Sequence, residues 1–156
     1  MHLAGRDPHR RRRLDDGASR DLSRILDHYL QEWGCSRVLV IGYSRGADLA
    51  PFMVSRLAPP LRERVVSVTM VGLSDVSNFQ YRPIDLFADA LRSNDYPILP
   101  EVEKLKGTMV LCISGVRERG SLCPSLDSSL AHVSTHPGGH RMTREVAARI
   151  LDQTPN

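Results

Sequence analysis

Short runs of aliphatic residues, separated by amphipathic segments, dominate the pattern of this chain. Four runs have the length and the β-branched content of buried strands. They span residues 37–41, 65–73, 109–114 and 131–135. Between and beside these runs, apolar residues recur at helical spacing. These segments are residues 20–32, 45–57, 83–91, part of 96–105, and 143–151. Because strands that alternate with helices form parallel sheets, the pattern predicts an α/β fold, with about four mostly parallel strands and helices on both faces.

The first helical segment shows the clearest period. Its apolar residues share one face at helical spacing: Leu22, Ile25, Leu26, Tyr29 and Leu30. Residues 1–18 have no such period and contain a run of four arginines at positions 10–13. We therefore expect a disordered basic tail over residues 1–18 and a single domain over residues 19–156.

The first strand runs directly into Gly42-Tyr43-Ser44-Arg45-Gly46 and then into a helical pattern. Gly-x-Ser-x-Gly between a strand and a helix is typical of a nucleophile elbow, a tight turn that exposes the serine hydroxyl above the end of a sheet. Both glycines are expected to make room for the turn and for close packing of strand and helix. The N-terminus of the helix would favour negative charge near Ser44. The alternative is a plain strand–turn–helix with a surface serine.

A serine nucleophile needs a general base and a carboxylate that orients the base. His140 ends a Pro-Gly-Gly-His loop between the fourth strand and the last helix, and it is the predicted base. Glu118 lies three residues past the glycine that ends the third strand, and it is the predicted acid, with Asp75 as its rival. Ordinary surface pairing of Glu118 with Arg117 or Arg119 is the alternative.

These residues predict the chemistry of acyl transfer. His140 would take the proton of Ser44 as the serine oxygen attacks an ester-type carbonyl, and Glu118 would orient the imidazole and stabilise its charged form. The backbone N–H of Arg45 would donate one hydrogen bond to the oxyanion. His136 is expected to belong to the end of the fourth strand.

Composition narrows the classes of function. A chain of 156 residues is long enough for one domain, and its apolar stretches are too short to span a membrane. No apolar region follows the arginine run, so we do not expect residues 1–18 to act as a signal peptide of the secretory type. The net charge of +3 comes from residues 1–13, which contribute +4. No aromatic residues interleave these arginines, so we expect no nucleic-acid partner.

The chain has three cysteines, an odd number, so they cannot all pair in disulfides within one chain. Spacing alone favours three separate buried or partly buried thiols, at Cys35, Cys112 and Cys123. A Cys112–Cys123 bridge is the alternative, and it would staple the loop that carries the predicted acid. No Cys-x-x-Cys or His–Cys spacing of a metal site is present, so neither a metal nor another cofactor is expected.

The chain resembles the bacterial virulence protein VirJ family, which includes the AcvB proteins. The resemblance extends over residues 22–151 and depends on several motifs together, which makes it far more specific than Gly-x-Ser-x-Gly alone. The motifs are Tyr29 with Trp33, residues 41–48 (IGYSRGAD), Pro51, 96–102 (YPILPEV), 111–113 (LCI), 121–124 (SLCP) and 137–140 (PGGH).

The resemblance implies an α/β-hydrolase fold and a serine hydrolase of esterase type that acts on lipids. For AcvB-like members it implies an aminoacyl-phospholipid substrate, lysyl-phosphatidylglycerol. It also implies a periplasmic location and an association with type IV secretion in plant-associated bacteria. Secretion-system proteins and the membrane surface that carries the substrate are the partners expected from this. In that oxidising compartment a Cys112–Cys123 disulfide becomes the expected state.

Two departures from the family pattern bear on activity. The family usually carries phenylalanine where this chain has Arg45, which places a cation beside the nucleophile. The strands and the Gly-rich loop with which members begin have no counterpart before residue 20, so residues 19–156 correspond to the C-terminal portion of an α/β-hydrolase domain. That loop would supply the second oxyanion donor. The first strand would then be an open edge, at which two copies of the chain could pair. The alternative function is a catalytically impaired remnant or an interaction domain of the same family.

Overall fold

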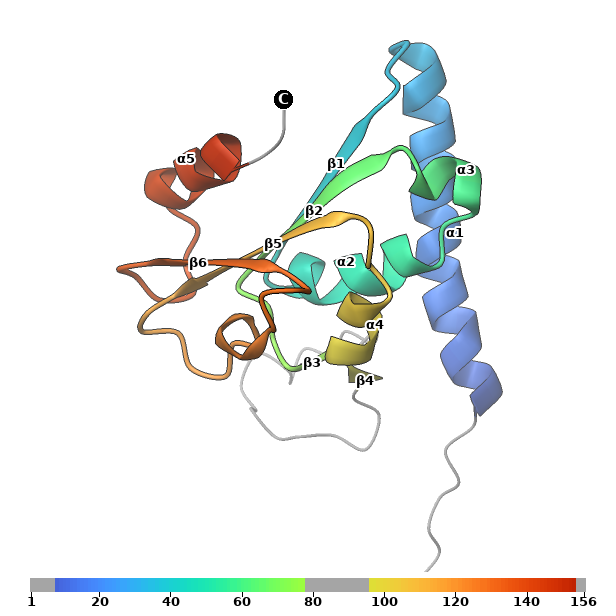
Figure 1. Ribbon diagram of the computed structural model, residues 1–156. Coiled ribbons are helices and arrows are strands. Elements are labelled where there is room, and N and C mark those ends of the chain that lie inside the picture. Colours follow the sequence, from blue (N-terminus) through green and yellow to red (C-terminus); the bar gives the residue numbers. More distant parts are fainter. Residues whose placement is uncertain (1–7, 78–95, 154–156) are drawn as a thin grey trace, which may run out of the picture.

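The computed structural model describes residues 8–77 and 96–153, and these residues form a four-stranded parallel sheet covered by helices (Figure 1). The strand order is β1-β2-β5-β6. The strands are β1 (Val38–Tyr43), β2 (Val65–Val71), β5 (Met109–Gly115) and β6 (His132–His136). β2 and β5 lie inside the sheet and are buried almost throughout, which explains why both read as continuous apolar runs. The predicted α/β fold with about four parallel strands is confirmed.

The register of the strands brings their carboxyl ends to one edge of the sheet. Tyr43 of β1 lies opposite Val71 of β2, which in turn lies opposite Ile113 of β5. Gly115 of β5 lies opposite His136 of β6. Ligand sites of open parallel sheets form at this edge, because the loops that follow neighbouring strands meet there.

One face of the sheet carries the larger helical layer. α2 (Arg45–Ser55) packs on β1 and β2, while α1 (Pro8–Glu32) and α4 (Leu99–Glu103) pack against α2. The short helix α3 (Pro59–Arg62) connects α2 to β2 and contacts α1. This layer contains most of the buried apolar side chains, and Phe52 of α2 is one of them.

The opposite face is covered by α5 (Arg144–Gln153). Its buried residues Val146 and Ile150 pack against apolar residues of the two inner strands: Val71, Leu111 and Ile113. Helices therefore lie on both faces, as predicted. The remaining described elements are the 3₁₀ turn η2 (Cys123–Ser125) and a small antiparallel pair, β3 (Val76–Ser77) with β4 (Tyr96–Pro97).

The first helix begins at Pro8, whereas the pattern of apolar residues predicts a helix from residue 20 and a disordered tail over residues 1–18. The helix therefore begins earlier than predicted, and residues 1–7 lie outside the described part. The four arginines at positions 10–13 have a high helix propensity, whereas the rule used for the prediction looks only for a period of apolar residues. Ser19 is buried, and its hydroxyl donates to the carbonyl of Met53 in α2 at 3.0 Å. This bond ties α1 to α2.

Other element boundaries differ from the predictions by a few residues. The second strand ends at Val71 instead of residue 73, because Gly72 has a φ of +68° and leaves the extended region. The helix predicted at 83–91 lies outside the described residues. None of the helices within 8–77 and 96–153 has the length and apolar character needed to cross a membrane.

A disulfide joins Cys112 in β5 to Cys123 in η2. Both residues are fully buried, whereas Cys35 is exposed and its thiol is free. The interpretation of three separate thiols, drawn from spacing alone, is therefore wrong, and the pairing implied by the family resemblance is present. Spacing could not decide this, since bridging requires the two Cα atoms to lie about 5.5 Å apart, which only the folded chain establishes.

The disulfide is expected to contribute to stability. It closes a loop across a sequence separation of 11 residues, and cross-links of this size restrict the unfolded chain by roughly 2–3 kcal/mol. Replacing Cys112 and Cys123 together by alanine should lower the free energy of unfolding in urea by about this amount. Cys35→Ser is the matched control, and it should change the free energy by less than about 0.5 kcal/mol because that thiol is exposed. Equal stability of the bridged and alanine forms would contradict this expectation.

Candidate active site

Ser44 occupies the sharp turn between β1 and α2. Its backbone has φ 53° and ψ −122°, and among the described non-glycine residues Ser44 is the one with a positive φ. Such a conformation is strained for a residue with a Cβ and persists only where the surrounding structure imposes it. Here the Ser44 N–H donates to the carbonyl of Val71 at 2.8 Å, while the Ser44 carbonyl accepts from Ala47 at 2.8 Å and from Asp48 at 3.1 Å. The segment is therefore a tight turn between strand and helix, with Ser44 at its apex.

The two glycines of the motif have different roles. A Cβ on Gly42 would lie 2.3 Å from the carbonyl oxygen of Gly46, so this position admits no side chain while β1 and α2 pack this closely. A Cβ on Gly46 would meet nothing within 4 Å. The expectation that both glycines make room by lacking a side chain is therefore correct for Gly42 and wrong for Gly46.

Three side chains from distant parts of the chain form one line of hydrogen bonds. The imidazole Nε2 of His140 lies 2.7 Å from Ser44 Oγ, and its Nδ1 lies 2.5 Å from Glu118 Oε1. A carboxylate can only accept, which assigns the ring proton to Nδ1 and leaves Nε2 to accept from the serine hydroxyl. The structure thus brings the predicted nucleophile, base and acid together in the order that proton transfer requires.

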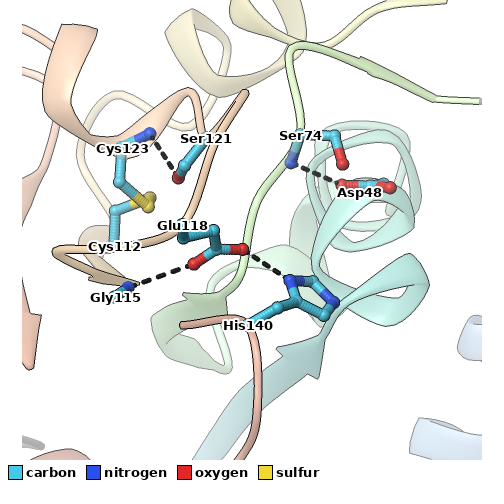
Figure 2. Close-up of a disulfide and its surroundings, with 8 residues drawn as sticks. All are labelled: Asp48, Ser74, Cys112, Gly115, Glu118, Ser121, Cys123 and His140. Atoms are coloured by element: carbon cyan, nitrogen blue, oxygen red, sulfur yellow. Dashed lines mark hydrogen bonds and ion pairs between the residues drawn. A yellow bond between two sulfur atoms is a disulfide. The ribbon is translucent and has the colours of Figure 1, made fainter. Parts of the chain in front are cut away.

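The carboxyl of Glu118 is held from both sides (Figure 2). Its Oε2 accepts the N–H of Gly115 at 3.1 Å, and Oε1 faces the imidazole. The backbone N–H of Glu118 also donates to the Gly115 carbonyl at 2.9 Å, which closes a tight turn at the end of β5. Asp75, the rival candidate, is exposed, and the place beside His140 Nδ1 is occupied by Glu118.

His140 is positioned by its backbone as well as by Glu118. Its carbonyl accepts the hydroxyl of Tyr43 at 2.9 Å, and the two rings stack with centroids 5.6 Å apart. The loop before it passes tightly over β5, since a Cβ on Gly115 would lie 2.5 Å from the Gly138 carbonyl oxygen. His136 is the buried last residue of β6, in agreement with its predicted place at the strand end.

The imidazole and the carboxylate of this hydrogen-bonded line differ in their exposure to solvent. The side chain of His140 is 47% exposed, whereas that of Glu118 is 8% exposed. A substrate can therefore approach the serine and the imidazole, while the carboxylate is shielded from water. Shielding strengthens the interaction between the carboxylate and the imidazolium that forms when the serine loses its proton.

Sequence reasoning missed the role of Gly72, which directly follows β2. A Cβ at this position would lie 2.8 Å from His140 Cε1 and 3.2 Å from Glu118 Oε1. The bare backbone of Gly72 therefore forms the floor under the imidazole and the carboxylate. The available signal was a glycine at the carboxyl end of a predicted inner strand, where catalytic loops gather.

Sequence reasoning also missed Asp48, one helical turn after Ser44. Its Oδ1 accepts the backbone N–H of Ser74 at 2.9 Å (Figure 2). Burial raises the pKa of this carboxyl to about 6, although hydrogen bonds from Ser74 and the nearby charges of Arg45 and His140 oppose the shift. A carboxylate held at this cost beside a nucleophile is a feature of functional sites.

The chemistry available to this site is proton transfer and nucleophilic attack. Arg45, the predicted oxyanion donor, opens α2 directly after Ser44, which is the position from which elbow turns donate to an oxyanion. Within residues 8–77 and 96–153, no three histidine, cysteine, aspartate or glutamate side chains lie close enough together to hold a metal ion.

The chain matches one protein family in sequence, and its structure has a low similarity to several solved structures. The family described as bacterial virulence protein (VirJ) matches residues 9–155 of this chain. No curated protein is significantly similar in sequence. Among solved structures, a protein described as a predicted CIB-like hydrolase from Thermoplasma acidophilum aligns at 14% identity and a TM-score of 0.47. The alignment covers 81% of this chain and 50% of that one, so this chain spans half the length of that hydrolase.

Two further solved structures are similar at the same low level of identity. A thioesterase domain from the curacin biosynthetic pathway aligns at 14% identity and a TM-score of 0.49, covering 84% of this chain and 69% of that domain. An esterase from a marine microorganism aligns at 11% identity and a TM-score of 0.42, covering 81% of this chain and 72% of that enzyme.

Proposed function

Because the chain belongs to the VirJ family of bacterial virulence proteins, we propose that it is a serine hydrolase of esterase type with the triad Ser44, His140 and Glu118. The observation that carries the proposal is the unbroken line of hydrogen bonds from Ser44 Oγ through both ring nitrogens of His140 to Glu118 Oε1. A surface serine after an ordinary strand has no reason to adopt a positive φ and to contact an oriented imidazole.

The proposed reaction follows from the direction of these hydrogen bonds. Ser44 Oγ forms a bond to the ester carbonyl carbon while its proton passes to His140 Nε2, and the Arg45 N–H stabilises the oxyanion. His140 then gives this proton to the leaving alkoxide as the ester C–O bond breaks. In the second half, His140 Nε2 takes a proton from a water molecule as the water oxygen bonds to the acyl carbon. The bond from that carbon to Ser44 Oγ then breaks, His140 returns the proton to Oγ, and the free acid leaves.

The substrate class and the cellular setting follow from the family resemblance. We infer that the substrate is an aminoacyl-phospholipid such as lysyl-phosphatidylglycerol at a membrane surface, and that the protein acts in the periplasm in connection with type IV secretion. The Cys112–Cys123 disulfide supports an oxidising compartment, since structural disulfides persist in the periplasm and are rare in the cytosol.

One observation favours a second candidate, an interaction domain. β1 is the outer strand of the described sheet, and three of its side chains are exposed apolar groups, Leu39, Ile41 and Tyr43. Alternate residues of an outer strand also direct backbone N–H and C=O groups away from the sheet, where another strand can pair with them. Such an edge suits a second copy of the chain or a secretion-system protein.

A fluorophosphonate probe separates the two candidates. It reacts only with an activated serine, so the wild-type chain should be labelled, and Ser44→Ala should abolish both labelling and hydrolysis of a short p-nitrophenyl ester. We expect a loss of hydrolysis of the order of 10⁴-fold or more. Ser128→Ala, at an exposed serine, is the matched control and should remain labelled. A wild-type chain that takes up no probe would sink the hydrolase proposal and leave the interaction domain.

A further inference from the structure

The carboxyl of Asp48 connects the helix that follows the nucleophile to the loop that follows β2. The backbone N–H of Asp48 donates to the Ser44 carbonyl at 3.1 Å, so Asp48 closes the first turn of α2. Its Oδ1 accepts the N–H of Ser74 at 2.9 Å. Figure 2 shows Asp48 reaching from α2 to this loop.

The loop over residues 72–75 lies against His140 and Glu118, and it also contacts the segment that follows Glu118. Gly72 is the floor under the imidazole of His140 and under Glu118 Oε1. The carbonyl of Leu73 accepts the N–H of Leu122 at 2.9 Å, and Ser74 forms an isolated bridge with Ser121, so the loop also holds the segment that follows Glu118. A displacement of this loop would therefore move the base and the acid relative to Ser44.

The carboxylate of Asp48 is costly where it lies. Burial opposes its ionisation, and the charged groups that face it are Arg45 on its own helix and His140 on the loop before α5. The turn itself needs no carboxylate at this position, since its hydrogen bonds join backbone groups only, including the N–H of Asp48. A half-buried ionisable group kept at such a cost beside the proposed nucleophile indicates a role in function.

We propose that Asp48 is a positioning residue. It holds the 72–75 loop in the place where Gly72 packs under the imidazole of His140 and keeps that ring beside Ser44. The catalytic consequence rests on the hydrolase function proposed above. Asp48 does not touch the reacting atoms. It acts through Ser74 and Gly72, and misplacement of a catalytic group by about 1 Å costs up to 10²-fold in rate.

Two variants of Asp48 separate the hydrogen bond from the charge. Asp48→Ala removes the acceptor and should lower kcat by about 10-fold to 100-fold with little change in KM, because the proposed role acts through Ser74 and Gly72 on the position of His140 and not on substrate binding. Asp48→Asn keeps an oxygen acceptor for the Ser74 N–H and should restore a large part of kcat. Asp127→Asn is the matched control, since Asp127 accepts the N–H of Ser129 at 2.7 Å in an exposed turn, and its kcat should equal that of the wild type.

The pH dependence of kcat/KM distinguishes a positioning role of the Asp48 carboxylate from a role in stability alone. The ratio of kcat/KM between wild type and Asp48→Asn cancels the titration of shared groups that do not interact with Asp48, and it retains the coupling between Asp48 and His140. With the pKa of Asp48 raised to about 6, the carboxylate is present above this pH and is neutralised below it. The ratio should therefore rise through pH 6 to a plateau above about pH 7 and fall towards 1 below about pH 5.

Two measurements by NMR test the proposal without turnover. In Asp48→Ala the amide hydrogen of Ser74 should exchange faster than in the wild type, and the nuclear Overhauser contact between His140 Hε1 and Gly72 Hα should weaken. Unchanged exchange and an unchanged contact would overturn the proposal, as would a wild-type kcat in Asp48→Ala. If the wild type reacts with neither ester nor probe, the hydrolase function fails, while the NMR contact still decides whether Asp48 positions His140.

Discussion

Replacing Glu118 by glutamine is expected to lower kcat by about 10⁴-fold, with little change in KM or in the free energy of unfolding. The carboxylate accepts at both oxygens, from the His140 ring and from the Gly115 N–H. Glutamine has one oxygen and one NH₂ group, so it can accept from only one of these two donors. If the oxygen stays on the Gly115 N–H, the NH₂ group faces Nδ1 and favours the tautomer with its proton on Nε2, which cannot take the proton of Ser44.

Glu103→Gln is the control for this prediction, because Glu103 is an exposed glutamate at the end of α4. Rates of ester hydrolysis for the two variants and the wild type, together with urea unfolding curves, provide the measurement. A Glu118→Gln protein that is folded and hydrolyses esters at the wild-type rate would show that Glu118 is not the acid. The same kinetics on Asp75→Asn would then test the rival carboxylate.

Replacing Gly42 by alanine is expected to destabilise the protein by about 3 kcal/mol or more. The new Cβ would lie 2.3 Å from the Gly46 carbonyl oxygen and 2.7 Å from the Ala47 nitrogen. Both contacts are with backbone, which cannot rotate away as a side chain does. Strand β1 and helix α2 would have to move apart, and the elbow that holds Ser44 at a positive φ would be lost with them.

Gly46→Ala is the matched control in the same motif. Its Cβ would meet nothing within 4 Å, and alanine is the better helix former, so stability should stay equal or rise by up to about 1 kcal/mol. Urea unfolding of both variants and labelling of Ser44 by the fluorophosphonate probe measure the two effects. Equal stability of Gly42→Ala and Gly46→Ala would contradict the close packing of β1 on α2.

Two of the family motifs meet at the candidate active site. The match over residues 9–155 confirms the resemblance that the short motifs indicate, including residues 41–48 and 137–140. Of these motifs, the first contains both the proposed nucleophile Ser44 and Asp48, and the last contains the proposed base His140. Their two segments meet where Tyr43 donates to the carbonyl of His140. The motifs thus lie together at the carboxyl edge of the sheet, although nearly a hundred positions separate them in the chain.

Local sequence was sufficient for the four strands of the parallel sheet, for most of the described helices and for the tight turn at Ser44. The period of apolar residues and the strand–Gly-x-Ser-x-Gly–helix order depend on neighbours within a few positions, so a single sequence contains them. The same rule explains the error in α1, because an apolar period does not detect a helix that is continued by propensity alone. It also explains why His140 was the natural base, since its loop follows a strand and precedes a helix.

Only the tertiary structure could choose Glu118 over Asp75, join Cys112 to Cys123 and separate the roles of Gly42 and Gly46. The same holds for Gly72 and Asp48, whose contacts with His140 and Ser74 carry no local signal. Each of these outcomes depends on a distance between segments that are far apart in the chain. The sequence alone therefore determined which residue types were available and which elements carry them. The packing of β1, β2, β5 and α2 decided which of these residues touch, because contact distances are set by how whole elements pack.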